Sequence, residues 1–341
     1  MTDPLAALAR PRCAMRGIDV GKTPRSVTPD VRAARDGRAS IEIDPRMGDQ
    51  QRPRHVAAAS RPESSPRRRW ERSHRGARLA YRRVGRGEPL ILLHGLGHSR
   101  RSWDPVIDRL AAERDVIAID LPGHGDSPGL PNGRGWAPAD QAVAVAELLD
   151  ELGLETAHVA GNSTGGWVAL ELGRLQRVRS VAALSPGGLW RRSGFLQIGA
   201  AMRLVRLGAR TIRRLIPDAP RTRLARGLFT AQASGHPFKV PYEQARTAAD
   251  AMAAAPGFRE TLRAAERRRF RDGEAIRVPV TIAFGSRDWA LVPVVARRRK
   301  ELPGHARWVK LPGLGHIPML DDPETVARLL LETSQPAGSA A

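Results

Sequence analysis

A serine between two glycines occurs in a setting that can turn its hydroxyl group into a nucleophile. Ser163 is the centre of a G-x-S-x-G sequence, residues 161–165. Residues 156–160 favour a short buried strand before it, and residues 167–172 favour a helix after it. A strand that enters a helix through one sharp turn holds the turn residue in strained geometry, with its side chain pushed out above the sheet. The pattern predicts a reactive serine, against the alternative of a capping serine in an ordinary glycine-rich loop.

A serine hydroxyl needs a general base, and that base needs a further group that fixes its tautomer. If these groups follow the order serine, acid, histidine, only His236, His305 and His316 lie late enough in the chain. His316 follows the final predicted strand, on a loop at the same sheet edge as Ser163, so it is the candidate base. Asp288 lies just beyond an earlier strand and is the candidate acid, which would bind the other imidazole nitrogen.

An oxyanion that forms when a carbonyl group is attacked needs two N–H donors that are already aimed at it. Thr164, the residue after the nucleophile, supplies one donor in this arrangement. The loop after the apolar strand 90–93 supplies the other, with Leu96 as the candidate and Gly97 as the reserve. Both donors therefore belong to loops that we expect around Ser163.

Other ionisable residues near the same loops are interpreted as structural. His94 and His98 precede the nucleophile in the chain; we predict that His94 is a buried scaffold residue and His98 a loop or pocket-wall residue. Asp120 ends a strand but also precedes Ser163, and we interpret it as structural together with Asp126.

Strands and helices alternate from residue 76 onward, with one interruption. Continuous apolar runs such as 90–93 and 116–119 are typical of buried parallel strands. Their alternation with helices predicts an α/β fold with a doubly wound, mostly parallel sheet. Residues 187–276 contain helical segments and no apolar strand. We predict a core of residues 76–186 and 277–341, with residues 187–276 inserted as a helical lid over the carboxyl ends of the strands, where such sheets bind ligands.

The longest helix expected in this insertion, over residues 195–216, is amphipathic and strongly basic. We expect its apolar face to roof a pocket for an apolar acyl group while its arginines are solvated. The alternative is a weak contact of the arginines with an anionic partner, such as a lipid surface, a phosphate-bearing thioester or an acidic carrier protein. The face residues are Ile198, Met202, Val205, Ile212 and Ile216, and the arginines are Arg203, Arg206, Arg210, Arg213 and Arg214.

The net charge of +21 is concentrated in two parts of the chain. Residues 1–75 carry about +8 and the insertion about +11, while the part that holds Ser163 is near neutral. We expect no specific nucleic-acid binding, because aromatic residues that could stack on bases are missing from the basic tail until Trp70. Residues 1–75 are expected to form a disordered Arg/Pro-rich tail, and Met15 and Met47 leave a mis-assigned start open.

Cysteine usage and hydropathy bear on the compartment and on the cofactor chemistry. Cys13 is the only cysteine of the 341 residues. We therefore expect neither a disulfide nor a thiolate metal site in the folded part, which fits a reducing compartment. No apolar run approaches the ~20 residues that span a bilayer, and the first residues lack the apolar stretch of a secretory signal. The expected location is cytoplasmic, and no cofactor or metal is implied.

Five segments match, in order, the landmarks of one protein family. They are residues 94–97, 120–127, 161–166, 285–288 and 315–316. On these segments, residues 76–335 resemble the α/β-hydrolase fold family, in its serine esterase or lipase-like branch with an inserted helical lid. The resemblance implies a metal-free and cofactor-free hydrolase. Its implied nucleophile, acid and base are Ser163, Asp288 and His316, and its implied oxyanion hole consists of the amides of Leu96 and Thr164.

The same resemblance narrows the substrate class. Dehalogenases and epoxide hydrolases of this fold use an aspartate nucleophile, whereas position 163 is a serine. Epoxide hydrolases also use two lid tyrosines, and Tyr242 is the only tyrosine of the insertion. The carbon–carbon bond hydrolases usually carry a loop of small residues after His-Gly, and residues 98–101 depart from it. Hydrolysis of carboxylic esters with an apolar acyl group is therefore the expected activity.

Several alternatives stay open at this point. A cofactor-free perhydrolase or haloperoxidase-like enzyme shares the triad, as does a thioester or carbon–carbon bond hydrolase. A ligand-binding receptor on this fold is the alternative outside catalysis, but an intact order of nucleophile, acid and base favours an enzyme. The acyl size and the oligomeric state are not specified by the sequence.

Overall fold

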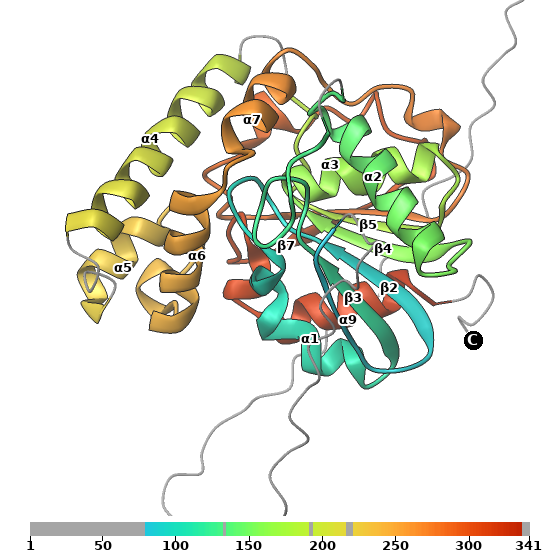
Figure 1. Cartoon of the computed structure of the whole chain (residues 1–341), viewed down its shortest axis with the longest axis horizontal. Coiled ribbons are helices and arrows are strands. Elements are labelled where there is room, and N and C mark those ends of the chain that lie inside the picture. The colour runs from blue at the N-terminus through green and yellow to red at the C-terminus, as the bar shows by residue number, and fades with distance from the viewer. Residues whose placement is uncertain (1–78, 132–133, 191–193, 216–220, 336–341) are drawn as a thin grey trace, which may run out of the picture. The chain divides into compact units, whose positions relative to one another are not determined.

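The structure is a computed structural model, and it describes residues 79–131, 134–190, 194–215 and 221–335 (Figure 1). The predicted tail of residues 1–75, with Cys13, lies outside these ranges. Within them, no helix is long enough and apolar enough to cross a membrane.

A seven-stranded sheet organises the described residues. Its strands are β1 (Tyr81–Val84), β2 (Glu88–Leu93), β3 (Arg114–Ile119), β4 (Ala157–Asn162), β5 (Val178–Leu184), β6 (Val280–Gly285) and β7 (Arg307–Leu311). They lie in the order β1-β3-β2-β4-β5-β6-β7, and every neighbouring pair is parallel except β1 with β3. The predicted mostly parallel sheet is confirmed.

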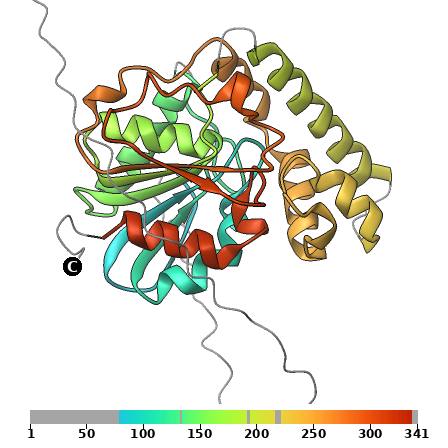
Figure 2. The same cartoon turned by 180° about the vertical axis from the view of Figure 1, so that it is seen from behind.

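Helices cover both faces of the sheet, as Figures 1 and 2 show from opposite sides. They are α1 (Asp104–Ala111) and α9 (Pro323–Thr333) on one face and α2 (Pro138–Glu151) and α3 (Thr164–Arg174) on the other. Successive side chains of a strand point to opposite faces of the sheet, and the apolar side chains of β2 are buried on both faces. Ile91 and Leu93 join the apolar core beneath α2 and α3, while Leu90 and Leu92 join the core beneath α1 and α9. This arrangement confirms the doubly wound fold.

The parallel register brings the carboxyl ends of several strands to one edge of the sheet. β4 ends directly before Ser163, and Gly285, the last residue of β6, is paired with Leu311, the last residue of β7. Asp288 and His316 follow these two strand ends within a few residues. The three candidate residues therefore come from loops at the same edge.

Four described α-helices lie between β5 and β6. They are α4 (Gly194–Leu215), α5 (Arg223–Thr230), α6 (Tyr242–Ala254) and α7 (Phe258–Glu266). α4 packs against α6 and α7, and both views show these helices together beside the sheet. Leu96 of the candidate oxyanion loop belongs to a buried cluster with Ala209, Met252 and Phe258 of these helices. The insertion is thus packed on the loop that follows β2, while its role as a lid stays a prediction.

Part of the predicted apolar face of α4 packs inward as expected, while Ile216 lies outside the described residues and one arginine departs from the prediction. Met202 and Val205 pack against the buried cluster of the insertion. Arg206, which we expected to be solvated, instead donates to the carbonyl of Ala255 at 2.8 Å. Its guanidinium lies 4.5 Å from the ring centroid of Phe258. The α6–α7 corner offers both the Ala255 carbonyl and an aromatic face, and a long amphipathic side chain reaches them at modest cost.

One helix is shorter than the sequence predicts. The pattern predicts a helix near residues 294–301, but α8 spans only Pro293–Ala296. Arg297 leaves helical geometry, with φ −126° and ψ 54°. The N–H of Arg298 then donates to the carbonyl of Leu189 at 2.9 Å. A tertiary hydrogen bond replaces the helical one, so local propensity does not decide where the helix ends.

Candidate active site

Ser163 occupies the sharp turn between β4 and α3. Its backbone has φ 56° and ψ −116°, which is strained for a residue other than glycine. The turn needs glycine on both sides, since a β-carbon on Gly161 would lie 2.1 Å from the carbonyl oxygen of Gly165. A β-carbon on Gly165 would lie 2.2 Å from the carbonyl oxygen of Leu93. The partly exposed serine therefore stands in the strand–turn–helix setting that the motif requires.

Asp288 and His316 are in direct contact. The Nδ1 atom of His316 lies 3.2 Å and 3.1 Å from the two carboxylate oxygens of Asp288. The carboxylate is buried, and its Oδ1 also accepts the N–H groups of Ala290 at 3.1 Å and Leu291 at 2.8 Å. Burial alone would raise the pKa of Asp288, but the adjacent His316 and the Leu291 N–H hold this pKa below its ordinary value. An ionised Asp288 that accepts from Nδ1–H leaves Nε2 of His316 for proton exchange.

Two residues that the sequence analysis did not assign hold the loop of His316. The side-chain amide of Asn162 donates to the His316 carbonyl at 2.8 Å. The carboxylate of Asp321 accepts the N–H of Gly315 at 2.7 Å and the N–H of Gly235, in the insertion, at 2.9 Å. The position of Asn162 beside the nucleophile was a signal that could have identified it. Asp321 carries no such signal, because only the folded chain brings its partners together, namely the Ser234 hydroxyl and the N–H groups of Gly235, His236 and Gly315.

Leu96 and Thr164 are the residues predicted to supply the oxyanion hole. Both line the same cavity as Ser163 and His316. Thr164 is the first residue of α3, where backbone N–H groups have no partner within the helix. No backbone hydrogen bond between described residues uses the N–H of Leu96 or of Thr164. Gly97, the reserve candidate, turns the chain with φ 74° and is not among the residues that line this cavity.

The cavity beside Ser163 is mainly apolar and has a volume of about 240 Å³. Helices α4 and α7 supply part of its wall. A smaller space of about 70 Å³ adjoins it, and α6 supplies part of that wall. The two spaces share His316, Met202, Gln232 and Ala290, but only the larger one contains Ser163. His316 thus stands at the junction of two compartments.

The other late histidines do not reach this junction. Nε2 of His305 lies 2.9 Å from the carbonyl oxygen of Val278, and Nδ1 of His236 lies 3.4 Å from the guanidinium of Arg287. Neither histidine lines the cavity of Ser163. Among these candidates, only His316 lines the cavity that contains Ser163.

His98 lines the smaller space, in agreement with its predicted place in a pocket wall. Its Nδ1 atom lies 3.3 Å from the hydroxyl oxygen of Ser102. Burial, followed by the proximity of His316, lowers the pKa of His98 to about 4. This second imidazole of the site is therefore uncharged at neutral pH.

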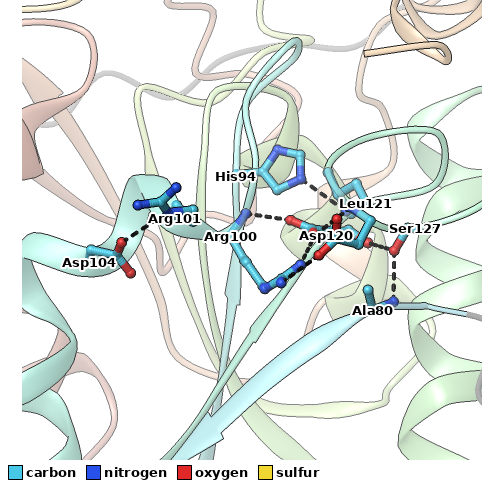
Figure 3. Close-up of polar contacts among 9 residues, drawn as sticks. Ala80, His94, Arg100, Arg101, Asp104, Asp120, Leu121 and Ser127 are labelled. Atoms are coloured by element: carbon cyan, nitrogen blue, oxygen red, sulfur yellow. Dashed lines mark hydrogen bonds and ion pairs between the residues drawn. The ribbon is translucent and has the colours of Figure 1, made fainter. Parts of the chain in front are cut away.

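Asp120 belongs to a separate polar network that includes Arg100, in the segment after β2 (Figure 3). Its carboxylate accepts the backbone N–H of Arg100 at 2.6 Å and that of Asp126 at 2.9 Å, and it pairs with the Arg100 guanidinium. His94 is fully buried beside it, and its Nε2 accepts the N–H of Leu121 at 2.9 Å. These bonds join the loops after β2 and β3, in line with the structural roles predicted for Asp120, Asp126 and His94.

Comparisons with known proteins point to one family. The model of the alpha/beta hydrolase family matches residues 90–329. The dihydrolipoyllysine-residue acetyltransferase component of the acetoin cleaving system of Cupriavidus necator is 45% identical over 116 residues, which cover 33% of this chain and 30% of that protein. The chain thus spans less than a third of the length of this relative. Epoxide hydrolase EphH of Mycobacterium tuberculosis is 31% identical over 199 residues, or 54% of this chain and 89% of that protein.

A solved structure shows the same fold. An esterase from Rhodococcus sp. ECU1013 aligns with a TM-score of 0.57 and 24% sequence identity, over 76% of this chain and 96% of that one. At this identity the likeness shows the fold alone. The family match rests on sequence; it runs from β2 to α9 and includes the turn of Ser163 and the loop of His316. The chain therefore belongs to the alpha/beta hydrolase family.

Proposed function

We propose that this member of the family is a serine hydrolase that cleaves carboxylic esters through an acyl-enzyme intermediate. The observation that carries the proposal is the contact of His316 with the buried Asp288, at the edge of the cavity that Ser163 lines. A carboxylate that holds Nδ1–H leaves Nε2 as the basic nitrogen of a neutral imidazole. A base of this kind is what a serine hydroxyl needs in order to attack a carbonyl group at neutral pH.

In the proposed reaction the Ser163 oxygen attacks the carbonyl carbon while its proton moves to Nε2 of His316. The N–H groups of Leu96 and Thr164 stabilise the oxyanion. The ester C–O bond then breaks, and His316 gives its proton to the leaving alcohol. Water attacks the acyl-enzyme with His316 again as the base, which releases the acid and restores the serine.

The proposal requires a small movement at Ser163. Among the described residues, no hydrogen bond joins the Ser163 hydroxyl to the His316 ring. Catalytic hydrogen bonds of enzymes without substrate are often long and shorten in the substrate complex. We assign this change to a rotation of the Ser163 side chain when the ester binds.

The two compartments suit the two parts of an ester. His316 must protonate the leaving oxygen, so the alcohol part has to lie on the His316 side. The smaller space contains His316 but neither Ser163 nor Leu96, so we assign it to the alcohol part. The larger, apolar cavity then takes the acyl part. Helices α4, α6 and α7 wall these compartments, and this placement supports a lid role for the insertion.

The similarity to a protein named epoxide hydrolase raises a rival reaction. A carboxylate nucleophile opens an epoxide to an ester, which water can then hydrolyse. A serine hydroxyl would form an ether, which the same groups cannot cleave. Ser163 therefore favours acyl transfer over epoxide opening.

A substrate panel on the purified full chain tests the proposal. It contains p-nitrophenyl esters, matched thioesters and an aryl epoxide. We expect saturable ester hydrolysis and a kcat that falls ~10⁴-fold or more in Ser163→Ala. The control is Ser286→Ala, because Ser286 lies near the same sheet edge, bonds to the Gly313 N–H and lines no part of the cavity. Epoxide turnover without ester turnover, or full ester turnover in Ser163→Ala, would contradict the proposal.

A further inference from the structure

A second groove, lined by arginines, lies beside the cavity of Ser163. Its volume is about 610 Å³, and Trp190 lines both spaces. One wall is formed by residues 137–139, at the start of α2, and by one face of α3. The other wall is formed by residues 266–269 and 271, at and just after the end of α7. The groove contains neither Ser163 nor His316, so the proposed ester hydrolysis does not account for it.

The charge of this groove is strongly positive, because its carboxylates are already neutralised. Glu171 pairs with Arg174 at 2.7 Å, and Glu266 pairs with Arg203 of α4. The remaining charged side chains of the lining are four arginines that make no ion pair and no side-chain hydrogen bond with any described residue. They are Arg267, Arg268, Arg269 and Arg271.

The backbone that carries these arginines is fixed in place. Phe270 is fully buried between them, and its N–H donates to the carbonyl of Gly188 at 3.1 Å. The carbonyl of Arg268 accepts the indole N–H of Trp190 at 3.2 Å. Four guanidinium groups within five residues repel one another, and a bound anion would relieve that repulsion. Guanidinium groups also match the oxygens of phosphate with pairs of parallel hydrogen bonds.

We propose that this groove binds a phosphate or diphosphate group of a small molecule, at a site separate from the Ser163 cavity. A nucleic acid fits the groove less well, because the tryptophans of the groove, Trp167 and Trp190, are only 2% and 7% exposed and cannot stack on bases. The shared Trp190 places the anion next to the wall of the cavity that we assign to the acyl group. The site does not depend on the proposed ester hydrolysis, so its test needs no activity.

Isothermal titration calorimetry of the full chain with inorganic pyrophosphate, at constant ionic strength, tests this site. The groove variant replaces the four arginines by glutamine: R267Q, R268Q, R269Q and R271Q. The charge-matched control removes four arginines from α4 and α5: R210Q, R213Q, R214Q and R223Q. We expect affinity to fall ~10-fold or more in the groove variant and less than ~2-fold in the control. A groove variant with lysine at the four positions keeps the charge but cannot form pairs of parallel hydrogen bonds with phosphate. Its affinity for pyrophosphate should therefore lie between that of the glutamine variant and that of the control.

Three results would overturn the proposal. An equal loss of affinity in the groove variant and the control would mean that net charge alone attracts the anion. Unchanged affinity in the groove variant would place the anion elsewhere, for example on the basic tail. Binding of a short DNA duplex more tightly than pyrophosphate, with the same loss in the groove variant, would reassign the groove to nucleic acid. Thermal melting confirms that each variant is folded; if the glutamine variant is not, R269Q and R271Q replace it as single changes.

Discussion

The side-chain amide of Asn162 donates a 2.8 Å hydrogen bond to the backbone carbonyl of His316. The same amide donates to the carbonyl of Leu184, at the end of β5, at 3.2 Å. Two strands separate β4 from β7 in the sheet, so this one side chain reaches across the carboxyl edge. It thereby fixes the distance between the turn that carries Ser163 and the loop that carries the candidate base.

Replacing Asn162 by alanine is expected to lower kcat for a p-nitrophenyl ester ~10²-fold, because small misplacements of a catalytic group cost about that much. KM should change little, since Asn162 does not line the cavity. Steady-state kinetics separates the two parameters. A higher KM with unchanged kcat would show that Asn162 affects binding and does not position His316.

Asp288 and Asp120 are both buried carboxylates, and we expect their amide variants to differ. Asp288→Asn should lower kcat ~10⁴-fold, because an amide at this position favours the wrong tautomer of His316. Asp120→Asn should lower the melting temperature while the folded protein retains its kcat, because Asp120 contacts Arg100 and Asp126 and not His316. The kcat and melting temperature of both variants decide the assignment. A larger loss of kcat in Asp120→Asn, with stability intact, would transfer the acid role to Asp120.

The strand ends and the order of the site residues follow from local sequence. Apolar runs locate the parallel strands, and parallel strands end at one edge, so Ser163, Asp288 and His316 could be assigned to that edge before any coordinates were known. The supporting bonds could not be assigned in this way. Asn162 bonds to the distant His316 and Asp321 to the distant Gly235, and no periodicity of the sequence encodes such pairs.

Side-chain partners on α4 were likewise beyond sequence reasoning. Helical spacing identified the face of Met202 and Val205, but it could not distinguish a solvated arginine from one that packs. Arg206 packs because the α6–α7 corner presents the Ala255 carbonyl and the Phe258 ring to it. The early end of α8 has the same kind of cause, a hydrogen bond made outside the helix.

A buried histidine should make stability depend on pH. Burial lowers the pKa of His124 to about 4 in the folded chain, whereas an unfolded chain has a value of about 6.5. As the pH falls below 6.5, His124 is therefore protonated in the unfolded state while it stays neutral in the folded state. The contribution of neutral His124 to the free energy of unfolding is therefore fully present above about pH 6.5 and is lost as the pH falls toward 4. Between pH 7 and pH 5 this residue lowers the free energy of unfolding by about 2 kcal/mol.

Urea unfolding of the wild type and of His124→Asn at pH 7 and pH 5 measures this contribution. Asparagine keeps a donor for the carbonyl of Pro122, which lies 2.9 Å from Nδ1 of His124. We expect His124→Asn to be the less stable protein at pH 7 but to lose less stability on acidification. An identical loss in both proteins would mean that His124 is not held neutral.

Substitution of two alanines tests which compartment binds the alcohol part of the ester and which binds the acyl part. Ala248, on α6, lines the smaller space, and Ala201, on α4, lines the cavity of Ser163. Ala248→Leu should lower kcat/KM ~10-fold or more for acetates of long alcohols and spare methyl esters of long acids. Ala201→Leu should show the reverse preference. The measurement is kcat/KM of each variant for both series of esters. If Ala248→Leu instead impairs the methyl esters of long acids and Ala201→Leu the acetates of long alcohols, our placement of the alcohol and acyl parts is reversed.

Intact-protein mass spectrometry of the acid-quenched reaction shows whether Ser163 carries the acyl group during turnover. With p-nitrophenyl acetate in excess, we expect one added acetyl group per chain, which peptide mapping should place on Ser163. Asp288→Asn should form this adduct more slowly, and Ser163→Ala should not form it. Rapid ester hydrolysis without any adduct, or an acetyl group located on another residue, would show that Ser163 is not the nucleophile.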